Sequence, residues 1–385
     1  MWKEAAVVSM AAGVYGRGER SGRLRLWLAA LSAPFELAGK TRLPKTLITG
    51  AAGFIGAHLS RELLARGHEI VGIDNLNDYY DPGLKHARLE WIGSHPGFVF
   101  ERIDVADPAL ICGLVQYGCF DTVVHLAAQA GVRYSLTNPL VTGQSNLIGH
   151  LNILEAVRRA DPSPFLVYAS SSSVYGNNTP APFREDAPVD SPVSLYAATK
   201  RAAELMSESY TNLFCLKQIG LRFFTVYGPW GRPDMAYWKF ASKILRGDPI
   251  DLFNNGALER DFTWIGDIVD GIVKVVEGGP DHLPHSRSHR IYNIGNNNPV
   301  RLTDFVSILE ARLGKQASKR LVPMQPGDVY RTAADIGAIR SDYGFEPSTS
   351  LRAGLGLFCD WFSTWTTGVA APVEVGRPLK KDSAA

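Results

Sequence analysis

Short apolar runs alternate with amphipathic stretches over most of the chain. The runs TLITG, EIVGID, DTVVHLAA and FLVYASS are typical of buried strands, and the segments HLSRELLARG, NLIGHLNILEAVRRA and VSLYAATK have helical spacing. Such an alternation is typical of a parallel sheet whose strands are connected by crossover helices. We therefore predict an α/β fold with a doubly wound parallel sheet over residues 45–225.

The pattern changes on either side of this sheet. After residue 225 it loosens into the Pro- and Gly-rich stretches GPWGRPDM and RGDPI, and helical spacing returns near 237–245 and 302–313. We predict a smaller C-terminal α/β substrate-binding lobe over residues 226–365, of which 265–295 return to the first domain. Residues 1–44 and 366–385 have no core-like pattern, and we expect both to be disordered. The first is either a transit peptide or, as we favour, upstream sequence included by an early start codon.

Composition and charge exclude several classes of protein. The chain has 385 residues, of which 45% are hydrophobic and 20% charged, as in soluble globular proteins. Its formal net charge of +2 gives no overall field that would gather nucleic acid or an anionic membrane, and no apolar run reaches the roughly 18 residues of a membrane span. The 4 cysteines include no C-x-x-C pair, so we expect no metal site, no disulfides and a cytoplasmic location.

Three glycines stand where the first apolar run gives way to a helix. They are Gly50, Gly53 and Gly56 in TLITGAAGFIGAHL. At such a junction backbone amides and the helix dipole can receive a pyrophosphate, and small residues let the phosphates approach the main chain. The spacing is G-x-x-G-x-x-G, which differs from the G-x-G-x-x-G of the standard fingerprint, so the position at the first strand is the stronger signal.

Later strand ends extend this nucleotide site. Asp74 ends EIVGID at about the position of the acid that binds an adenosine ribose, where a carboxylate repels a 2′-phosphate and favours NAD over NADP. The alternative is an ordinary turn residue. Asp104 follows the next strand near the expected adenine, and the small residues Ala127 and Ala128 leave room for a cofactor. We therefore predict a Rossmann domain that binds NAD.

Tyr196 and Lys200 in VSLYAATK lie one above the other on a helix. Alone, the pair would suggest only an amphipathic face. Beside a nicotinamide, however, an adjacent ammonium and the positive ring both favour the phenolate, so Tyr196 can take a proton near neutrality while Lys200 also binds the ribose. The strand end LVYASSSSVYG adds hydroxyls that either share the substrate oxygen with Tyr196 or satisfy backbone groups.

Together these motifs resemble the extended short-chain dehydrogenase/reductase family of nucleotide-sugar enzymes, over about residues 45–365. Within that family, DNLNDYYD, AAQAGVRYS, SLYAATK and RFFTVYGPWGRPDMA most resemble the enzymes that epimerise UDP-glucuronate at C4. The resemblance implies NAD as cofactor, a transient 4-keto sugar, a homodimer, and Ser171 as the catalytic hydroxyl beside Tyr196 and Lys200. Ser172 and Ser173 stand where the dehydratases of the family carry Asp-Glu, so elimination is not expected.

The resemblance also implies contacts to the sugar nucleotide. Thr225, Arg232 and Lys239 stand where similar epimerases anchor the C6 carboxylate, although Lys239 replaces an arginine of some relatives. For Arg232 the alternative is a pair with solvent or with Asp234. Arg260 is expected to contact phosphate and Asp328 the uridine ribose.

The predicted site has three groups of residues and no metal ligand. The catalytic residues are Tyr196, Lys200 and Ser171. The cofactor contacts are Gly50, Gly53, Phe54, Ile55, Gly56, Asp74, Asn75, Asp104, Val105, Leu126, Ala127, Ala128, Tyr196 and Lys200. The substrate contacts are Ser172, Ser173, Thr225, Arg232, Lys239, Arg260 and Asp328.

Three alternatives remain open at this point. A UDP-glucose 4-epimerase would act on the neutral sugar. A UDP-glucuronate decarboxylase would release the carboxylate, but AAQAGVRY replaces the Pro- and Ser-rich loop of those enzymes. A protein that only senses NAD on the same fold would be expected to have lost Tyr196 or Lys200.

Overall fold

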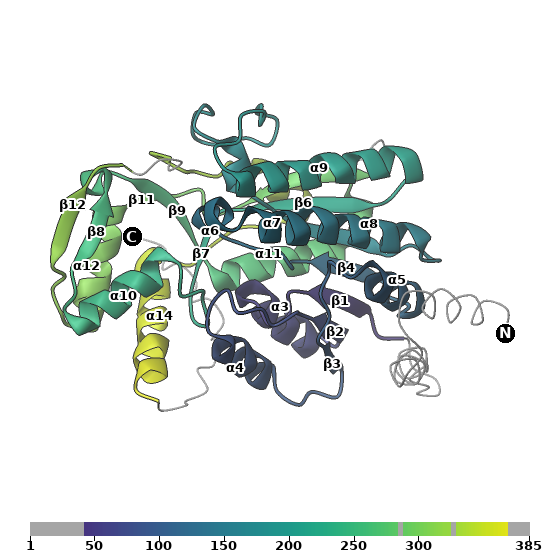
Figure 1. Cartoon of the computed structure of the whole chain (residues 1–385), viewed down its shortest axis with the longest axis horizontal. Coiled ribbons are helices and arrows are strands. Elements are labelled where there is room, and N and C mark those ends of the chain that lie inside the picture. The colour runs from purple at the N-terminus through teal and green to yellow at the C-terminus, as the bar shows by residue number, and fades with distance from the viewer. Residues whose placement is uncertain (1–41, 284–287, 325–328, 369–385) are drawn as a thin grey trace, which may run out of the picture.

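A seven-stranded sheet forms the centre of the computed structural model (Figure 1). Its order is β10-β6-β5-β4-β1-β2-β3, and every neighbouring pair is parallel. The strands are β1 (Lys45–Thr49), β2 (Glu69–Ile73), β3 (Phe98–Glu101), β4 (Thr122–His125), β5 (Phe165–Ser171), β6 (Gln218–Phe223) and β10 (His289–Ile294). The strand order reverses between β1 and β4, where ligands bind in doubly wound sheets. The predicted α/β fold is confirmed.

The structure describes residues 42–283, 288–324 and 329–368. The expected disorder of 1–44 and 366–385 falls almost wholly outside these ranges, as does Asp328. Among the described residues, no helix is long and apolar enough to cross a membrane.

Helices pack in two rows against the sheet. One row is formed by α4 (Pro82–Ile92), α3 (Phe54–Ala65) and α11 (Ile265–Gly278), and the other by α5 (Pro108–Tyr117), α8 (Gly149–Arg159) and α9 (Leu195–Phe214). Local sequence defines several helix starts: Asp81 and Asp107 each accept a hydrogen bond from the first turn and precede a proline, which fits the first helical position. Ser194 caps α9 in the same way, through the amide of Ala197.

A smaller lobe is built around two short sheets. The first has the order β11-β9-β7, and the second pairs β12 with β8. Its strands are β7 (Thr225–Tyr227), β8 (Ile250–Phe253), β9 (Glu259–Trp264), β11 (Pro299–Arg301) and β12 (Lys319–Val322), and its main helices are α10 (Ala236–Arg246), α12 (Leu302–Leu313) and α14 (Leu351–Thr366). α13 (Gly337–Tyr343) packs against β10 of the large sheet.

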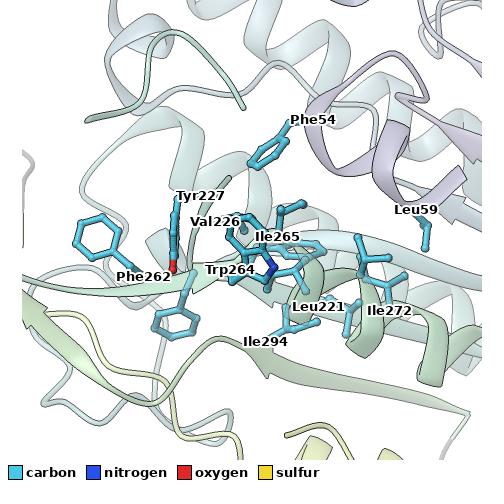
Figure 2. Close-up of a cluster of buried hydrophobic side chains, with 14 of the residues drawn as sticks. Phe54, Leu59, Leu221, Val226, Tyr227, Phe262, Trp264, Ile265, Ile272 and Ile294 are labelled. Atoms are coloured by element: carbon cyan, nitrogen blue, oxygen red, sulfur yellow. The ribbon is translucent and has the colours of Figure 1, made fainter. Parts of the chain in front are cut away.

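One hydrophobic core continues from the large sheet into the smaller lobe. Figure 2 shows Phe54 and Leu59 of α3, Phe262 and Trp264 of β9, and Ile272 of α11, all buried members of this cluster. Burying apolar surface is the main favourable term in folding, so a shared core holds the two parts in a fixed relation. The cleft described next lies between them.

Candidate active site

The predicted site residues line one cleft of about 660 Å³. Every predicted site residue that lies in a described range contributes to its wall, which leaves only Asp328 unplaced. They come from the β1–α3 turn, the end of β5, the segments that follow β2, β3, β4 and β5, helix α9, and the segments 225–240 and 251–262 of the smaller lobe. Because parallel strands end at one edge of a sheet, residues far apart in the chain meet here.

The glycine turn is shaped to approach a ligand closely. Gly50 has a φ of +75°, a left-handed conformation that favours glycine. A Cβ on Gly56 would lie 2.2 Å from the carbonyl oxygen of Gly50, so the start of the helix packs directly on the turn. Helix α3 begins at Phe54 with no side-chain cap and no acid in its first turn. Its amides and positive dipole end therefore suit a pyrophosphate, and the turn fits a dinucleotide.

The carboxylate of Asp74 stabilises a turn with one oxygen and leaves the other available to accept a hydrogen bond from a ligand. Its Oδ1 accepts from the amide of Leu76 at 2.8 Å and lies 3.4 Å from Nζ of Lys85, which also donates to Asn77 at 2.9 Å. Both contacts of Asp74 use Oδ1, so among the described residues Oδ2 has no hydrogen-bond partner and can accept from a ribose hydroxyl. Asp104 lies three residues beyond the end of β3 and accepts from Asn75 at 3.0 Å.

The proposed chemical residues meet where α9 crosses the end of β5. The hydroxyl of Ser171 lies beside the phenol of Tyr196 and donates to the hydroxyl of Ser173 at 3.2 Å. Lys200, one turn further on, donates to the carbonyl oxygen of Ala169 at 2.9 Å. These contacts give the helix face a fixed position over the strand end, and they bring the hydroxyl, the phenol and the ammonium to the same wall of the cleft.

The electrostatics of Tyr196 differ from the sequence-based expectation. Burial raises the pKa of Tyr196, while the charge of Arg232 and the neighbouring hydroxyl of Ser171 oppose that rise. The cation that favours the phenolate in the protein alone is thus Arg232, whereas Lys200 is directed to the backbone. Without further positive charge from a bound cofactor, the phenol is protonated at neutral pH.

A buried carboxylate fixes the helix that carries these groups. Glu204 lies one turn after Lys200 on α9 and is 1% exposed. It accepts from Ser170 at 2.6 Å and from two nitrogens of Arg222 at 2.8 and 2.9 Å. α9 is therefore tied to β5 and β6 by an ion pair that lies out of water. Glu204 was not predicted as a site residue, although its spacing of four from Lys200 places it on the same face of the helix.

At the smaller-lobe end, Arg232 already has a partner. It donates to Asp234 from Nε at 2.9 Å and from Nη2 at 2.6 Å, and the hydroxyl of Tyr79 donates to the same carboxylate at 3.0 Å. The pairing with Asp234 that competed with a substrate role is thus present, although Arg232, Asp234 and Tyr79 all line the cleft. Tyr79 belongs to DNLNDYYD and was not predicted as a site residue.

Positive charge exceeds negative charge along the cleft. Six basic side chains line it, Lys85, Arg133, Lys200, Arg232, Lys239 and Arg260, against four acids, Asp74, Asp104, Asp234 and Asp251. The chain as a whole is close to neutral, so this excess is local and suits an anionic ligand. Within 42–283, 288–324 and 329–368, no group of three or more His, Cys, Asp or Glu side chains could hold a metal ion.

Burial of Lys200 should make stability depend on pH. Its pKa is lowered from 10.5 to about 8, mainly by desolvation, with Glu204 acting in the opposite direction. The folded protein therefore holds a costly charge below pH 8, and this cost disappears as the pH rises towards 10.5.

The variant Lys200→Met removes that charge, so its stability relative to wild type should be pH-dependent. We expect the difference in unfolding free energy, variant minus wild type, to fall by about 2 kcal/mol between about pH 7 and about pH 9.5. The lost hydrogen bond to Ala169 cancels in this comparison because it contributes at both pH values. Urea denaturation at the two pH values measures the change, and a constant difference would contradict the lowered pKa.

Comparison with known proteins agrees with this arrangement. A model of the NAD dependent epimerase/dehydratase family matches residues 46–295. UDP-glucuronate 4-epimerase 6 of Arabidopsis thaliana is 46% identical over 348 residues, which cover 88% of this chain and 75% of the plant protein. Protein CapI of Staphylococcus aureus is 46% identical over 329 residues, which cover 83% of this chain and 98% of CapI.

A solved structure has the same architecture. The UDP-glucuronic acid 4-epimerase from Bacillus cereus, in complex with UDP-glucuronic acid and NAD, superposes with a TM-score of 0.76. It is 32% identical in sequence, and the match covers 83% of this chain and 99% of the Bacillus chain.

Proposed function

Since this chain belongs to the NAD dependent epimerase/dehydratase family, we propose that it inverts C4 of UDP-glucuronate to give UDP-galacturonate. The observation that carries the proposal is the meeting of three features in one cleft: the glycine turn, the group Tyr196, Ser171 and Lys200, and Arg232. The first suits NAD, the second suits proton transfer at a sugar hydroxyl, and the third suits a C6 carboxylate. The similarity to UDP-glucuronate 4-epimerases supports the same reaction.

The chain's own residues account for the proton transfers. When bound, NAD would supply the hydride chemistry at C4. Tyr196 takes the O4 proton as the 4-keto sugar forms and gives it back on reduction, and Ser171 holds the same oxygen through a hydrogen bond. Lys200 lies one turn away, where it can bind the nicotinamide ribose. Inversion requires that the keto sugar turn over within the cleft, so that the hydride returns to the opposite face.

The substrate contacts must also prevent two side reactions. A 4-keto uronate is a β-keto acid that loses CO₂ easily, so its carboxylate has to be held in an orientation that disfavours cleavage. In our proposal Thr225, Arg232 and Lys239 hold it, with Arg260 at the diphosphate. Elimination requires acids beside the sugar, and Ser172 and Ser173 supply none.

Product analysis tests this function directly. Purified protein incubated with UDP-glucuronate, without added NAD, should give a mixture of UDP-glucuronate and UDP-galacturonate in NMR spectra. UDP-xylose with release of CO₂ would establish a decarboxylase, and turnover of UDP-glucose alone would establish a neutral-sugar epimerase. Bound NAD without turnover of any UDP-sugar would favour a sensing role.

The domain boundaries and the location in the cell are also proposals. We propose a dinucleotide-binding domain over 45–225 and a substrate-binding lobe over 226–365, except that residues 265–295 belong to the dinucleotide-binding domain. The pairing of β10 with β6 of the large sheet supports this assignment of 265–295. A cytoplasmic location is supported by the four free thiols, two of them exposed, which suit a reducing compartment.

We further propose a homodimer formed through helices on one side of the molecule. α6 (Val132–Thr137), α7 (Pro139–Gly143) and α8 pack beside α9 (Figure 1). Large apolar side chains on this side are open to solvent: Leu140 is 86% exposed, Leu213 67% and Leu205 54%. Exposed leucines on neighbouring helices are typical of a protein interface.

Replacing exposed leucines of α9 by charged residues should therefore dissociate the dimer. The double variant Leu205→Glu and Leu213→Glu should elute as a monomer in size-exclusion chromatography with light scattering, with an unchanged circular dichroism spectrum, because both side chains are exposed in the single chain. Leu321→Glu, on β12 and 61% exposed, is the matched control and should leave the dimer intact. A wild-type protein that is monomeric at assay concentration would disprove the proposal.

A further inference from the structure

A buried arginine connects the glycine turn to the loop that carries Arg232. Arg88, on α4, is 0% exposed. Its Nη1 donates to the carbonyl oxygen of Ala52 in the glycine turn at 3.1 Å. Its Nε and Nη2 donate to the carbonyl oxygens of Trp230 and Gly231, each at 2.9 Å. These three bonds span 36 residues of chain in one direction and 143 in the other, so a single guanidinium joins the two sides of the cleft.

The loop that Arg88 holds has an unfavourable backbone. Trp230 has a φ of +59°, a left-handed conformation that side chains other than glycine, asparagine and aspartate rarely adopt. The next residue is crowded as well, because a Cβ on Gly231 would lie 2.1 Å from the hydroxyl of Tyr237. Such strain persists only where surrounding contacts impose it, and the two hydrogen bonds from Arg88 are contacts of this kind. Arg232 follows immediately in the chain.

Two tyrosines of DNLNDYYD complete the connection. The hydroxyl of Tyr80 lies 2.5 Å from Nη1 of Arg88, and the guanidinium also lies over the ring of Tyr80 at 5.4 Å. Tyr79 reaches the same loop independently, through its hydrogen bond to Asp234. The segment between β2 and α4 thus contacts the cofactor side through Asp74 and the substrate side through Tyr79.

We infer that Arg88 is a positioning residue that sets the place of Arg232 against the glycine turn. Among the described residues, Arg88 is not one that lines the cleft, and it acts through the backbone carbonyl oxygens of Trp230 and Gly231. In this way the geometry of the dinucleotide turn and that of the carboxylate anchor are fixed relative to each other. The part of this inference that concerns the uronate rests on the proposed function.

The variants Arg88→Lys and Tyr80→Phe test the connection between the glycine turn and the Arg232 loop, the first by a large change and the second by a small one. Lys keeps the charge but cannot donate to Ala52, Trp230 and Gly231 with the fork of a guanidinium. Tyr80→Phe removes only one hydroxyl from a half-buried ring, so it should fold. For Arg88→Lys we expect KM for UDP-glucuronate to rise by about 10-fold or more, with kcat and the affinity for UDP changed by less than about 3-fold, and for Tyr80→Phe a smaller rise of the same kind.

Amide hydrogen exchange of the holoenzyme gives a second readout that needs no sugar nucleotide. Exchange in residues 229–236 should be faster by about 10-fold or more in Arg88→Lys, since the carbonyls of the strained turn lose their donor. Arg66→Met is the control: Arg66 follows α3, in the same row of helices as α4, and its guanidinium pairs with Glu62 and Glu277 and not with either loop. It should change neither KM nor the exchange of this segment.

The outcomes separate this inference from the proposed function. If Arg88→Lys lowers thermal stability but leaves both KM for UDP-glucuronate and exchange in 229–236 unchanged, Arg88 is only structural and the inference fails. If wild type does not turn over UDP-glucuronate, the proposed function fails, and the exchange result still decides whether Arg88 holds the loop.

Discussion

Replacing Tyr196 by Phe should lower kcat for C4 inversion of UDP-glucuronate by about 1,000-fold. The phenol is the group that accepts the O4 proton in the proposed reaction. Ser171 donates to Ser173 and Lys200 to the carbonyl oxygen of Ala169, and neither replaces the phenol. The aromatic ring stays in place, so NAD content and UDP-glucuronate affinity should change little. NMR time courses on UDP-glucuronate, together with the NAD released on denaturation, measure both quantities.

Tyr175→Phe is the matched control for this result. Tyr175 is buried, donates its hydroxyl to Asn293 at 2.7 Å and does not line the cleft. Its loss should affect stability more than turnover. Near-normal kcat in Tyr196→Phe with bound NAD would show that another group accepts the proton.

Removing Arg232 should have the second-largest effect, and it should depend on the substrate. In Arg232→Ala, Asp234 loses its ion-pair partner and keeps only the hydrogen bond from Tyr79, so its negative charge near the expected C6 carboxylate is no longer compensated by Arg232. We expect kcat/KM for UDP-glucuronate to fall by about 100-fold or more, because truncating one partner of a partly buried ion pair adds repulsion to the lost attraction. UDP-glucose binding, measured by calorimetry, should change by less than about 10-fold.

The double variant Arg232→Ala with Asp234→Asn separates these two contributions. Without the repulsive carboxylate it should bind UDP-glucuronate more tightly than Arg232→Ala alone, although less tightly than wild type. If Arg232→Ala weakened the binding of UDP-glucuronate and of UDP-glucose equally, Arg232 would not be the residue that recognises the C6 carboxylate.

The single variant Arg232→Ala should also shift the pH profile of kcat. Arg232 lowers the pKa of Tyr196, so its removal raises that pKa. Activity that requires the phenolate should then appear only at higher pH, and the acid limb of kcat should move upwards. This shift applies to any substrate, which distinguishes it from the uronate-specific effect on binding.

Local regularities in the sequence predicted much of this protein. The helices expected near 237–245 and 302–313 are α10 and α12, and the strand-to-helix junction with three glycines is the β1–α3 turn. Hydrophobic periodicity indicates which face of an element is buried. This prediction does not require knowledge of the element that packs against that face. Strand ends in a parallel sheet share one edge, which is why the sequence alone predicts that Asp74, Ala127 and Ser171 meet.

Contacts between distant segments depended on the tertiary structure. Tyr79 and Asp234 are 155 residues apart, and Arg88 and Trp230 are 142 apart, so no spacing rule relates them. The environment of Tyr196 is of the same kind: burial raises its pKa, and the opposing cation, Arg232, arrives from another lobe. The sequence by itself determined which chemical groups are present and which helix face carries them. Their partners and their protonation were decided only when packing removed them from water, because burial and charge proximity are properties of the assembled fold.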